Sequence, residues 1–313
     1  MGVFLTPGTF GGVFLRLSFV ALCGFLSVAA NGHAAQTQNS KVVVVSTLES
    51  EPLPLTEYFS VLEDTGLAFS LVDIQRPDVA AQFTNKSAPA EALSFGYTRS
   101  AYWLRLTLSN TSGLPVERVL EIAYANISDI QFHRPTANGE YIPLATGNAL
   151  PFASRPYKNR YFVFPVTVPA QTDQVYYLRL KSASAMNIPA RLWTPQNFSA
   201  YERNDYIVQS LYFGMAIAMV LFNMLLFVVL RNPYYLLYVC FVTSMALSIA
   251  AQNGLTHEFL WPAATQWSES SRYFGFSLSL VTILLFMRLM LSTNLFVPGL
   301  DRFIKILTGV LIL

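Results

Sequence analysis

The stretch YWLRLTL at residues 102–108 alternates two kinds of side chain. Its even positions, from Tyr102 to Leu108, are large and apolar, and its odd positions include Trp103 and Arg105. Successive side chains of a β-strand point to opposite faces, so a period of two places the even positions together on one face. The pattern therefore predicts a strand with one face against a core.

The residues on both sides of this stretch repeat the strand pattern. Further β-branched, aromatic or alternating segments lie at residues 42–45, 120–124, 127–132, 161–168, 175–180 and 188–193. Turn-forming residues separate these segments, and Asn138-Gly139 is typical of a hairpin. One short helix is expected near Leu55–Leu62. Short strands with regular turn signals predict an all-β sandwich over residues 42–198.

The C-terminal third of the chain has a different composition. Ile207–Leu230 contains 24 residues without a charge, and a membrane-spanning helix needs about 20. The same reasoning predicts an all-α transmembrane domain over residues 206–313, with helices at 207–230, 234–251, 273–291 and 303–313. The fourth segment is too short to span a bilayer, so we expect that the chain is a fragment or stops within a helix.

Overall composition agrees with two domains, one of them in lipid. The chain has 313 residues, of which 53% are hydrophobic and only 12% charged, with a net charge of +2. Residues 36–200 carry 13 basic and 13 acidic residues. These values exclude a disordered chain, a coiled coil and a strongly charged nucleic-acid binder, so no nucleic-acid partner is expected.

The N-terminus predicts export. Residues 1–35 contain one positive charge at Arg16, an apolar run and then small residues, which is the order found in signal peptides. An uncleaved anchor helix is the alternative. Lipoprotein processing at Cys23 is disfavoured because the bulky Leu22 precedes it. After cleavage, the exported residues contain no cysteine and can form no disulfide.

The charges flanking the expected helices predict their orientation. Arg231 lies in the first connection, and Arg302 and Lys305 lie at the third. Positive residues collect on the cytoplasmic side of membrane proteins, so these two connections should be cytoplasmic. The sandwich then lies outside, as the signal peptide requires.

The exported residues show no recognisable catalytic constellation. Their one histidine is His133 after the signal peptide is removed, and no metal-ligand cluster, nucleophile triad or phosphate loop is visible. We therefore predict no enzyme activity, cofactor, catalytic residue or metal site. Carboxylates that meet only in the folded domain remain an open possibility.

Aromatic residues suggest ligand binding instead. Aromatic faces beside polar groups can bind sugar rings and other small polar molecules. The predicted ligand-binding residues are Tyr97, Trp103, Arg105, Tyr124 and Arg155. Trp103 and Tyr124 would stack on the ligand, and the two arginines would donate hydrogen bonds. The alternative is that the rings fill the core and the arginines are structural.

Several short motifs resemble one known family. They are Phe95-Gly96-Tyr97, the YWLR segment at 102–105 with Asn110, Arg155, Tyr177-Leu178-Arg179, Arg231–Leu236, Leu260-Trp261-Pro262 and Phe286-Met287-Arg288. In this order they resemble the type 2 extracellular domain and the helices of bacterial seven-transmembrane receptors with diverse intracellular signalling modules. The resemblance implies a jelly-roll sandwich similar to carbohydrate-binding modules, a seven-helix bundle that is truncated here, and a cytoplasmic kinase, diguanylate cyclase or phosphatase outside this chain.

Three functional hypotheses follow. The first is a sensory input module whose partners are a small periplasmic ligand, with carbohydrate as one candidate, the lipid bilayer, a cytoplasmic signalling unit and a second copy of the chain. The second is a transport or channel component with an exported β domain, for which Asn223 is the main intramembrane polar residue. The third is a membrane-tethered enzyme, which lacks a visible catalytic group.

Overall fold

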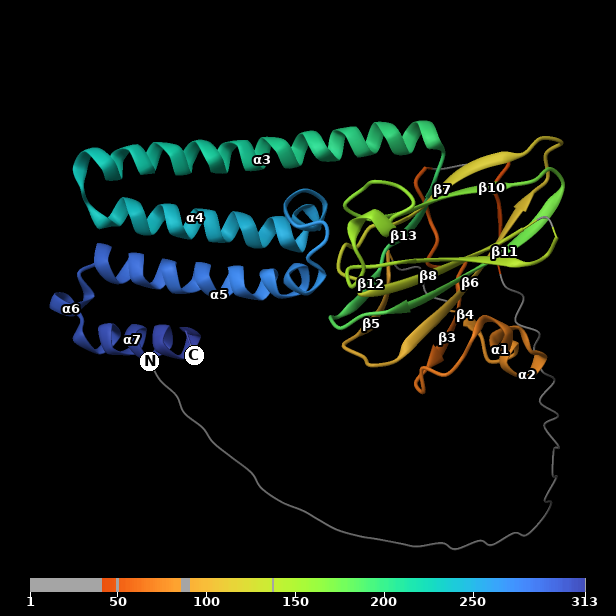
Figure 1. Ribbon diagram of the computed structural model, residues 1–313, viewed down its shortest axis with the longest axis horizontal. Coiled ribbons are helices and arrows are strands. Elements are labelled where there is room, and N and C mark those ends of the chain that lie inside the picture. The colour runs from red at the N-terminus through yellow and green to blue at the C-terminus, as the bar shows by residue number, and fades with distance from the viewer. Residues whose placement is uncertain (1–40, 49–50, 86–90, 137, 313) are drawn as a thin grey trace, which may run out of the picture. The chain divides into compact units, whose positions relative to one another are not determined.

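Strands occupy the N-terminal part of the described chain, and helices occupy the rest (Figure 1). The computed structural model describes residues 41–48, 51–85, 91–136 and 138–312, so the expected signal peptide at 1–35 lies outside the described residues. The strands lie between Val42 and Trp193, and helices follow from Pro195 to Ile312. The prediction of an all-β domain followed by an α-helical region is confirmed.

The first layer of the β domain is a seven-stranded sheet. Its order is β4 (Thr84–Asn85), β3 (Ser60–Asp64), β6 (Ala101–Asn110), β11 (Thr172–Lys181), β8 (Asp129–Pro135) and β9 (Tyr141–Thr146). These neighbours are antiparallel, and β1 (Val42–Val44) runs parallel beside β6. The alternating stretch quoted above lies in β6, which pairs with β1, β3 and β11.

The second layer is a four-stranded sheet with the order β10 (Phe162–Val168), β7 (Val116–Ile122), β13 (Ala190–Trp193) and β2 (Leu53–Pro54). A further pair joins β12 (Met186–Ile188) to β5 (Leu93–Gly96). The core contains Leu104 and Leu178 from the first sheet and Leu120 and Phe164 from the second. Each such buried side chain stabilises the fold by about 1.5–3 kcal/mol. The two sheets therefore form a sandwich around one apolar core.

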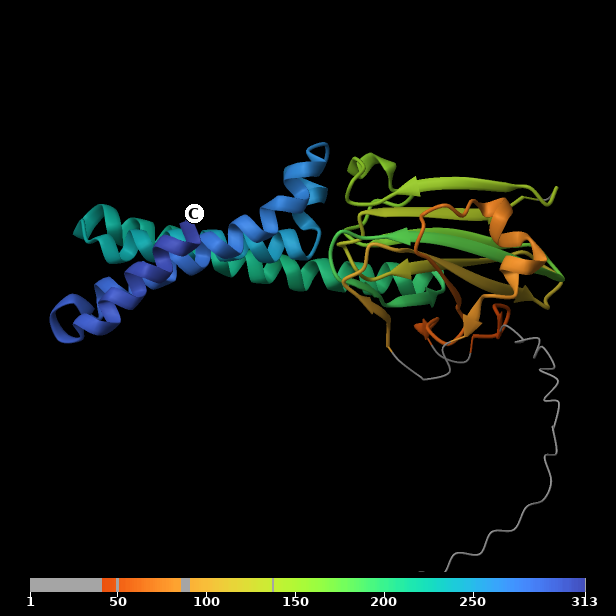
Figure 2. The same cartoon turned by 90° about the horizontal axis from the view of Figure 1, so that it is seen from below.

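Two short helices cover part of the other face of the seven-stranded sheet (Figure 2). They are α1 (Leu71–Gln75), which begins with a capping box between Ser70 and Asp73, and α2 (Pro77–Ala80). The helix expected near Leu55–Leu62 was wrong. Ser60–Asp64 forms β3 instead, because its pairing with β6 decides the conformation of a segment too short to specify a helix.

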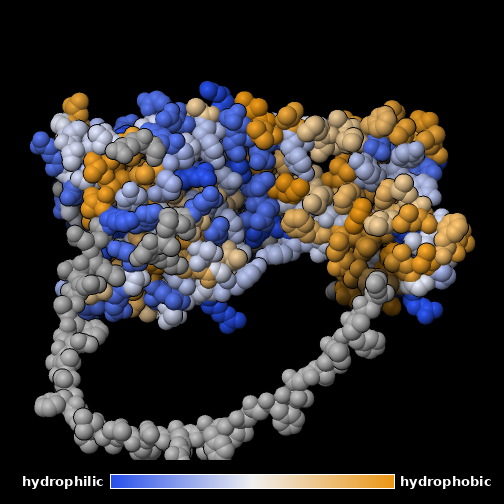
Figure 3. All heavy atoms as spheres, turned by 180° about the vertical axis from the view of Figure 1, so that it is seen from behind, coloured by the Kyte–Doolittle hydropathy of each residue, from blue (hydrophilic) through white to orange (hydrophobic). Residues whose placement is uncertain are grey.

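The helical part contains α3 (Pro195–Leu230), α4 (Pro233–Gln252), α5 (Thr265–Met290), α6 (Thr293–Phe296) and α7 (Pro298–Ile312). A single π-helical segment, η2 (Thr256–Leu260), lies between α4 and α5. Among the described residues, three segments are long and apolar enough to cross a membrane, namely Pro195–Leu230, Pro233–Gln252 and Ser270–Met290. Figure 3 shows hydrophobic side chains gathered over these helices and mainly hydrophilic ones over the sandwich.

Local chemistry explains the two ends of α3. Pro195 occupies the first turn, where a missing backbone N–H costs no hydrogen bond. The helix therefore starts upstream of Ile207, the residue at which its apolar run begins. It ends at Arg231, which is left-handed with φ 55°, and Asn232 then caps α4 by accepting a hydrogen bond from the Tyr234 amide. This tight reversal places α4 beside α3.

Candidate functional site

The structure places the five predicted ligand-binding residues in different surroundings. Trp103 is 1% exposed and stacks on His133, with ring centroids 5.5 Å apart, while Arg105 lies two residues along the same strand. Tyr97 is 83% exposed. The Tyr124 hydroxyl donates to the Ala185 carbonyl, and this ring packs against the main core. Trp103 and Arg105 are thus brought together, whereas Tyr97 and Tyr124 are not part of one cluster with them.

Arg155 belongs to a separate polar region, where the sandwich meets the helices. It is buried, and its guanidinium donates to the carbonyls of Asn159 at 2.6 Å and Tyr161 at 3.1 Å. Burial lowers its pKa to about 10. We call this region the junction, and define it by the contacts of residues 148–161 with the first turns of α3 and with residues 252–262.

An apolar cluster holds the first turns of α3 against the sandwich. Phe198, which is 1% exposed, packs with Val163 of β10 and Trp193 of β13. The rings of Tyr157 and Tyr201 lie against Phe198 at centroid distances of 5.6 and 6.5 Å. Because this cluster contains residues from both the second sheet and α3, the start of the helix is part of the folded sandwich domain.

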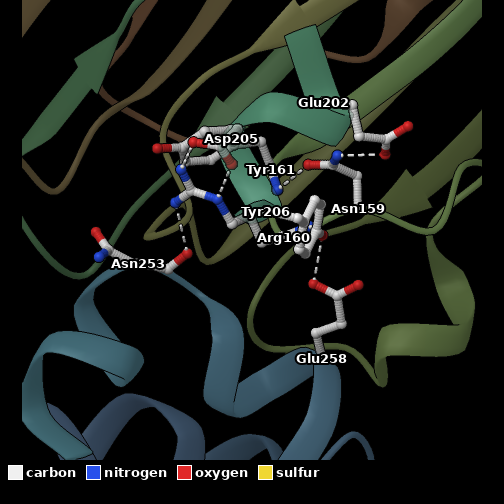
Figure 4. A network of polar contacts seen from close by, with 8 residues as sticks. All are labelled: Asn159, Arg160, Tyr161, Glu202, Asp205, Tyr206, Asn253 and Glu258. Carbon is white, nitrogen blue, oxygen red and sulfur yellow. Dashed lines mark hydrogen bonds and ion pairs between the residues drawn. The ribbon is translucent and has the colours of Figure 1, made fainter. Parts of the chain in front are cut away.

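Arg160 joins the sandwich to two helices at once (Figure 4). Its Nε and Nη2 atoms donate to the two carboxylate oxygens of Asp205 on α3, both at 2.8 Å. Its Nη1 atom donates to the carbonyl of Asn253, just after α4, at 3.2 Å. The Arg160 side chain is 3% exposed. A fork-to-fork ion pair of this kind fixes orientation as well as distance.

Two further carboxylates surround this ion pair (Figure 4). Glu202 of α3 accepts hydrogen bonds from Asn159 Nδ2 at 2.7 Å and from the Tyr157 hydroxyl at 2.8 Å. The Tyr206 hydroxyl donates to Glu258 of η2 at 2.7 Å and accepts from the Arg160 amide at 3.1 Å. Burial raises the pKa of Glu258. The helices α3 and η2 are therefore tied to the same short loop of the sandwich.

A second set of contacts reaches η2 and its flanks. His257 Nδ1 lies 2.9 Å from Asn148 Oδ1, and the Phe152 amide donates to the Pro262 carbonyl at 2.8 Å. Asn126 Nδ2 donates to the Gln252 carbonyl at 3.0 Å. Burial and the positive charge of Arg155 lower the pKa of His257 to about 4, so its ring is neutral at neutral pH.

Gly254 allows the closest approach in the junction. Its φ is +79°, and a Cβ atom there would lie 2.7 Å from both Ala125 Cβ and the Arg160 carbonyl oxygen. Only glycine adopts this conformation and this contact without strain. The chain after α4 is consequently pressed against the sandwich.

The polar side chains of the junction make structural contacts that connect the sandwich to the helices. Its carboxylates are engaged by arginine, asparagine and tyrosine donors, and no group of three or more His, Cys, Asp or Glu residues that could hold a metal occurs in the described part of the chain. Asn223, on which a transport interpretation depends, donates to the Met219 carbonyl of its own helix at 2.9 Å. The arrangement can transmit a change in position between the sandwich and the helices.

Sequence reasoning identified only Arg155 among these residues. Arg160, Asp205, Tyr206, His257 and Glu258 were not singled out, because their roles depend on contacts between distant segments. One signal was present: Glu202 and Asp205 lie directly before a long uncharged run, at the place where a chain enters the membrane. Charged residues at such a boundary lie next to the domain that precedes the helix, and Glu202 and Asp205 contact it here.

Comparisons with known proteins agree with this architecture. The family model described as 7TMR-DISM extracellular 2 matches residues 56–194, and the model described as 7TM diverse intracellular signalling matches residues 205–313. No curated protein matches the chain.

Among solved structures, the chain is similar to a family GH115 4-O-methyl-alpha-glucuronidase with specificity for decorated arabinogalactans. The identity is 15% and the TM-score 0.19, over 33% of this chain and 14% of the enzyme. A likeness at this level carries no argument about function. The two family models together cover most of the chain, in the order of the sandwich and the helices. The chain therefore belongs to the 7TMR-DISM family of membrane signalling receptors, with an extracellular sensor domain followed by its 7TM module.

Proposed function

We propose that the sandwich binds a small ligand in the periplasm, and that the junction transmits binding through the helices to a cytoplasmic signalling unit. The bilayer is the bacterial inner membrane in this proposal, and carbohydrate is the first ligand class to test. The observation that carries the proposal is the triple contact of Arg160, which bonds to Asp205 on α3 and to the carbonyl of Asn253 after α4.

Transmission requires two arrangements of the junction with different ligand affinity. A ligand that binds both arrangements equally shifts neither population, however tightly it binds. The junction is suited to discrete states because breaking a buried ion pair costs about 3–5 kcal/mol, so a small rotation of the sandwich must either keep the Arg160 contacts or exchange them. The helices then move with the sandwich loop to which they are bonded.

The test uses the full chain in nanodiscs with a fluorescent label on the opposite side of the membrane. The chain contains two cysteines, Cys23 and Cys240, so replacing both by serine and adding Phe296→Cys gives one labelling position, and Phe296 is 79% exposed. Fragments of cell-wall and exopolysaccharide serve as probes. We expect fragment binding to change the emission of the label, and Arg160→Gln to abolish that change while binding is retained.

A matched control separates transmission from general destabilisation. Lys41 and Glu57 form an exposed ion pair of 2.7 Å within the sandwich, and Lys41→Gln should leave the response of the label intact. Binding without any change of emission in the parent chain would contradict the proposal. An unchanged response in Arg160→Gln would contradict the role of the junction.

A further inference from the structure

The outward face of the seven-stranded sheet gathers polar and aromatic side chains from three strands. Alternation along β6 turns Trp103 and Arg105 away from the main core, which contains Leu104 and Leu106. The register places Tyr177 of β11 opposite Arg105, and His133 of β8 opposite Tyr177. Trp103 and Tyr177 lie in a second apolar cluster, and His133 stacks on Trp103. We call these four residues the outer-face cluster.

The outer-face cluster contains polar atoms that the described residues leave without hydrogen bonds. They are Trp103 Nε1, Arg105 Nε and both ring nitrogens of His133. Trp103 is 1% exposed and His133 7% exposed, so water does not reach these atoms from the surface. An unpartnered buried donor is unfavourable, and apolar side chains of similar shape would pack this face without that cost. The residue types are therefore those of a recognition surface, since ordinary core packing does not require them.

The cover over this face is a short helical segment. The two helices α1 and α2 have five and four residues, which is too short for either to be stable alone. They are held by Ile74, Val79 and Phe83, and the neighbouring Val72 is 72% exposed. Burial of each of these three side chains stabilises the cover by about 1.5–3 kcal/mol, and ligand binding must exceed that cost to displace it. Displacement of the cover leaves the pairing of β6, β11 and β8 intact.

The charges near the cluster are positive and incompletely neutralised. The Arg105 guanidinium lies 4.7 Å above the Phe83 ring of the cover and forms no ion pair within the described residues. Burial, followed by the positive charge of Arg179, lowers the pKa of His133, so its neutral ring offers one donor and one acceptor. Displacing Phe83 would expose the guanidinium to a carboxylate.

We propose that the outer-face cluster is the ligand site of the sensor domain, and that it binds an acidic sugar beneath the displaced α1–α2 segment. This inference rests on the proposed sensory function and names the site and ligand class. The sugar ring stacks on the Trp103 and Tyr177 rings, its hydroxyl oxygens accept from Trp103 Nε1 and interact with His133, and its carboxylate pairs with Arg105. Aromatic faces combined with directed N–H donors are suited to such a ligand.

The test uses the full chain in nanodiscs and trigalacturonate as the probe, with its methyl ester as the neutral control of the same ring shape. We expect trigalacturonate to bind at least about tenfold more tightly than the ester, and Arg105→Gln to lose about tenfold in affinity, which is 1.4 kcal/mol. Arg134→Gln is the matched control, because Arg134 is an exposed arginine on the neighbouring strand β8. It should change affinity less than about twofold.

Hydrogen exchange tests the movement of the cover. Amides of residues 69–83 should exchange faster in the complex, while those of β6 and β11 should not. Should Arg105→Gln fail to fold, Arg105→Lys takes its place, because it retains the charge and loses the guanidinium fork, and its affinity should be lower than that of the parent chain. Equal binding of the ester, full affinity in Arg105→Gln or Arg105→Lys, or unchanged exchange over residues 69–83 would each overturn the inference.

The label at position 296 distinguishes this inference from the proposed function. Arg105-dependent binding of trigalacturonate with no change in the label would leave the site standing and contradict transmission. A response of the label to another fragment, unaffected by Arg105→Gln, would support transmission and overturn the site.

Discussion

At the scale of one residue, the left-handed backbone and close contacts of Gly254 lead to a testable prediction. Gly254→Ala would combine a left-handed backbone with a Cβ placed 2.7 Å from Ala125 Cβ and the Arg160 carbonyl. The conformational cost alone is about 1–2 kcal/mol. We expect faster amide exchange over residues 252–262 and a lower melting temperature. Gly214→Ala is the control, since no atom lies within 4 Å of its added Cβ, and it should be neutral or slightly stabilising. Equal behaviour of the two variants would contradict the close contact.

At the same scale, His257 makes the folding stability of the protein depend on pH. Its pKa is lowered from 6.5 to about 4, first by burial and then by Arg155. As pH falls through this window, the unfolded chain binds a proton that the folded chain does not, so His257 reduces stability on acidification. The neighbouring Glu258 has a raised pKa and acts in the opposite direction, because its protonation favours the folded state.

The variant His257→Asn isolates the first of these effects. The melting temperature of the variant, relative to the parent chain, should rise steadily as pH falls below 6.5. The opposing contribution of Glu258 is present in both proteins and cancels from the difference. Thermal melts in nanodiscs at several pH values provide the measurement. A difference that does not vary with pH would show that His257 is not buried as a neutral ring.

At the scale of one element, α3 depends on an anchor that lies outside the membrane. Phe198 is 1% exposed between Trp193 and Tyr201, so Phe198→Ala should cost about 3–5 kcal/mol. Protease cleavage near residues 195–205 should become faster. Phe222 lies on the same helix and is 58% exposed, and Phe222→Ala should leave cleavage unchanged. Similar cleavage of both variants would mean that the helix is held from its membrane portion instead.

The elements also show which features a sequence can predict. Strand β6 could be predicted because large apolar side chains alternate with other residues from Tyr102 to Leu108, and this alternation indicates which face packs on the main core. The helix expected near Leu55–Leu62 was wrong, since the pairing of Leu62 with Trp103 is a contact across distant sequence. Helices α1 and α2 were missed because five and four residues are too few to show a helical period.

The candidate site could be predicted only in part, for a related reason. Trp103 and Arg105 belong to one strand, so their common face follows from strand geometry. Arg160 and Asp205 are 45 residues apart, and His257 and Asn148 are 109 apart. No periodic pattern in the sequence connects the members of such pairs, and their contact depends on how the helices join the sandwich. Residues that share one face of a strand can thus be inferred from alternation, whereas contacts between the two domains require the structure.

At the scale of the whole molecule, the membrane orientation is open to a direct measurement. The basic residues near the α3–α4 and α5–α7 connections predict that these connections are cytoplasmic and that the sandwich is outside. In a background in which Cys23 and Cys240 are both serine, Asp173→Cys introduces a thiol at an exposed position near the start of β11, and Phe296→Cys introduces one in α6. A membrane-impermeant maleimide added to spheroplasts should label position 173 alone. Labelling of position 296 alone would reverse the orientation and remove the basis for sensing outside the cell.

Because α3 is long and is fixed at its start, a small tilt there produces a larger displacement at its far end. A helix of 36 residues is about 54 Å long, and its first turns are fixed to the sandwich by Phe198, Glu202 and Asp205. The 25 residues after Asp205 are about 38 Å long, so a tilt of about 5° relative to the fixed first turns displaces the far end by about 3 Å. A rearrangement too small to disturb the packing of the sensor is thereby amplified with distance. The turn at Arg231, at the far end of α3, is where the largest displacement is expected.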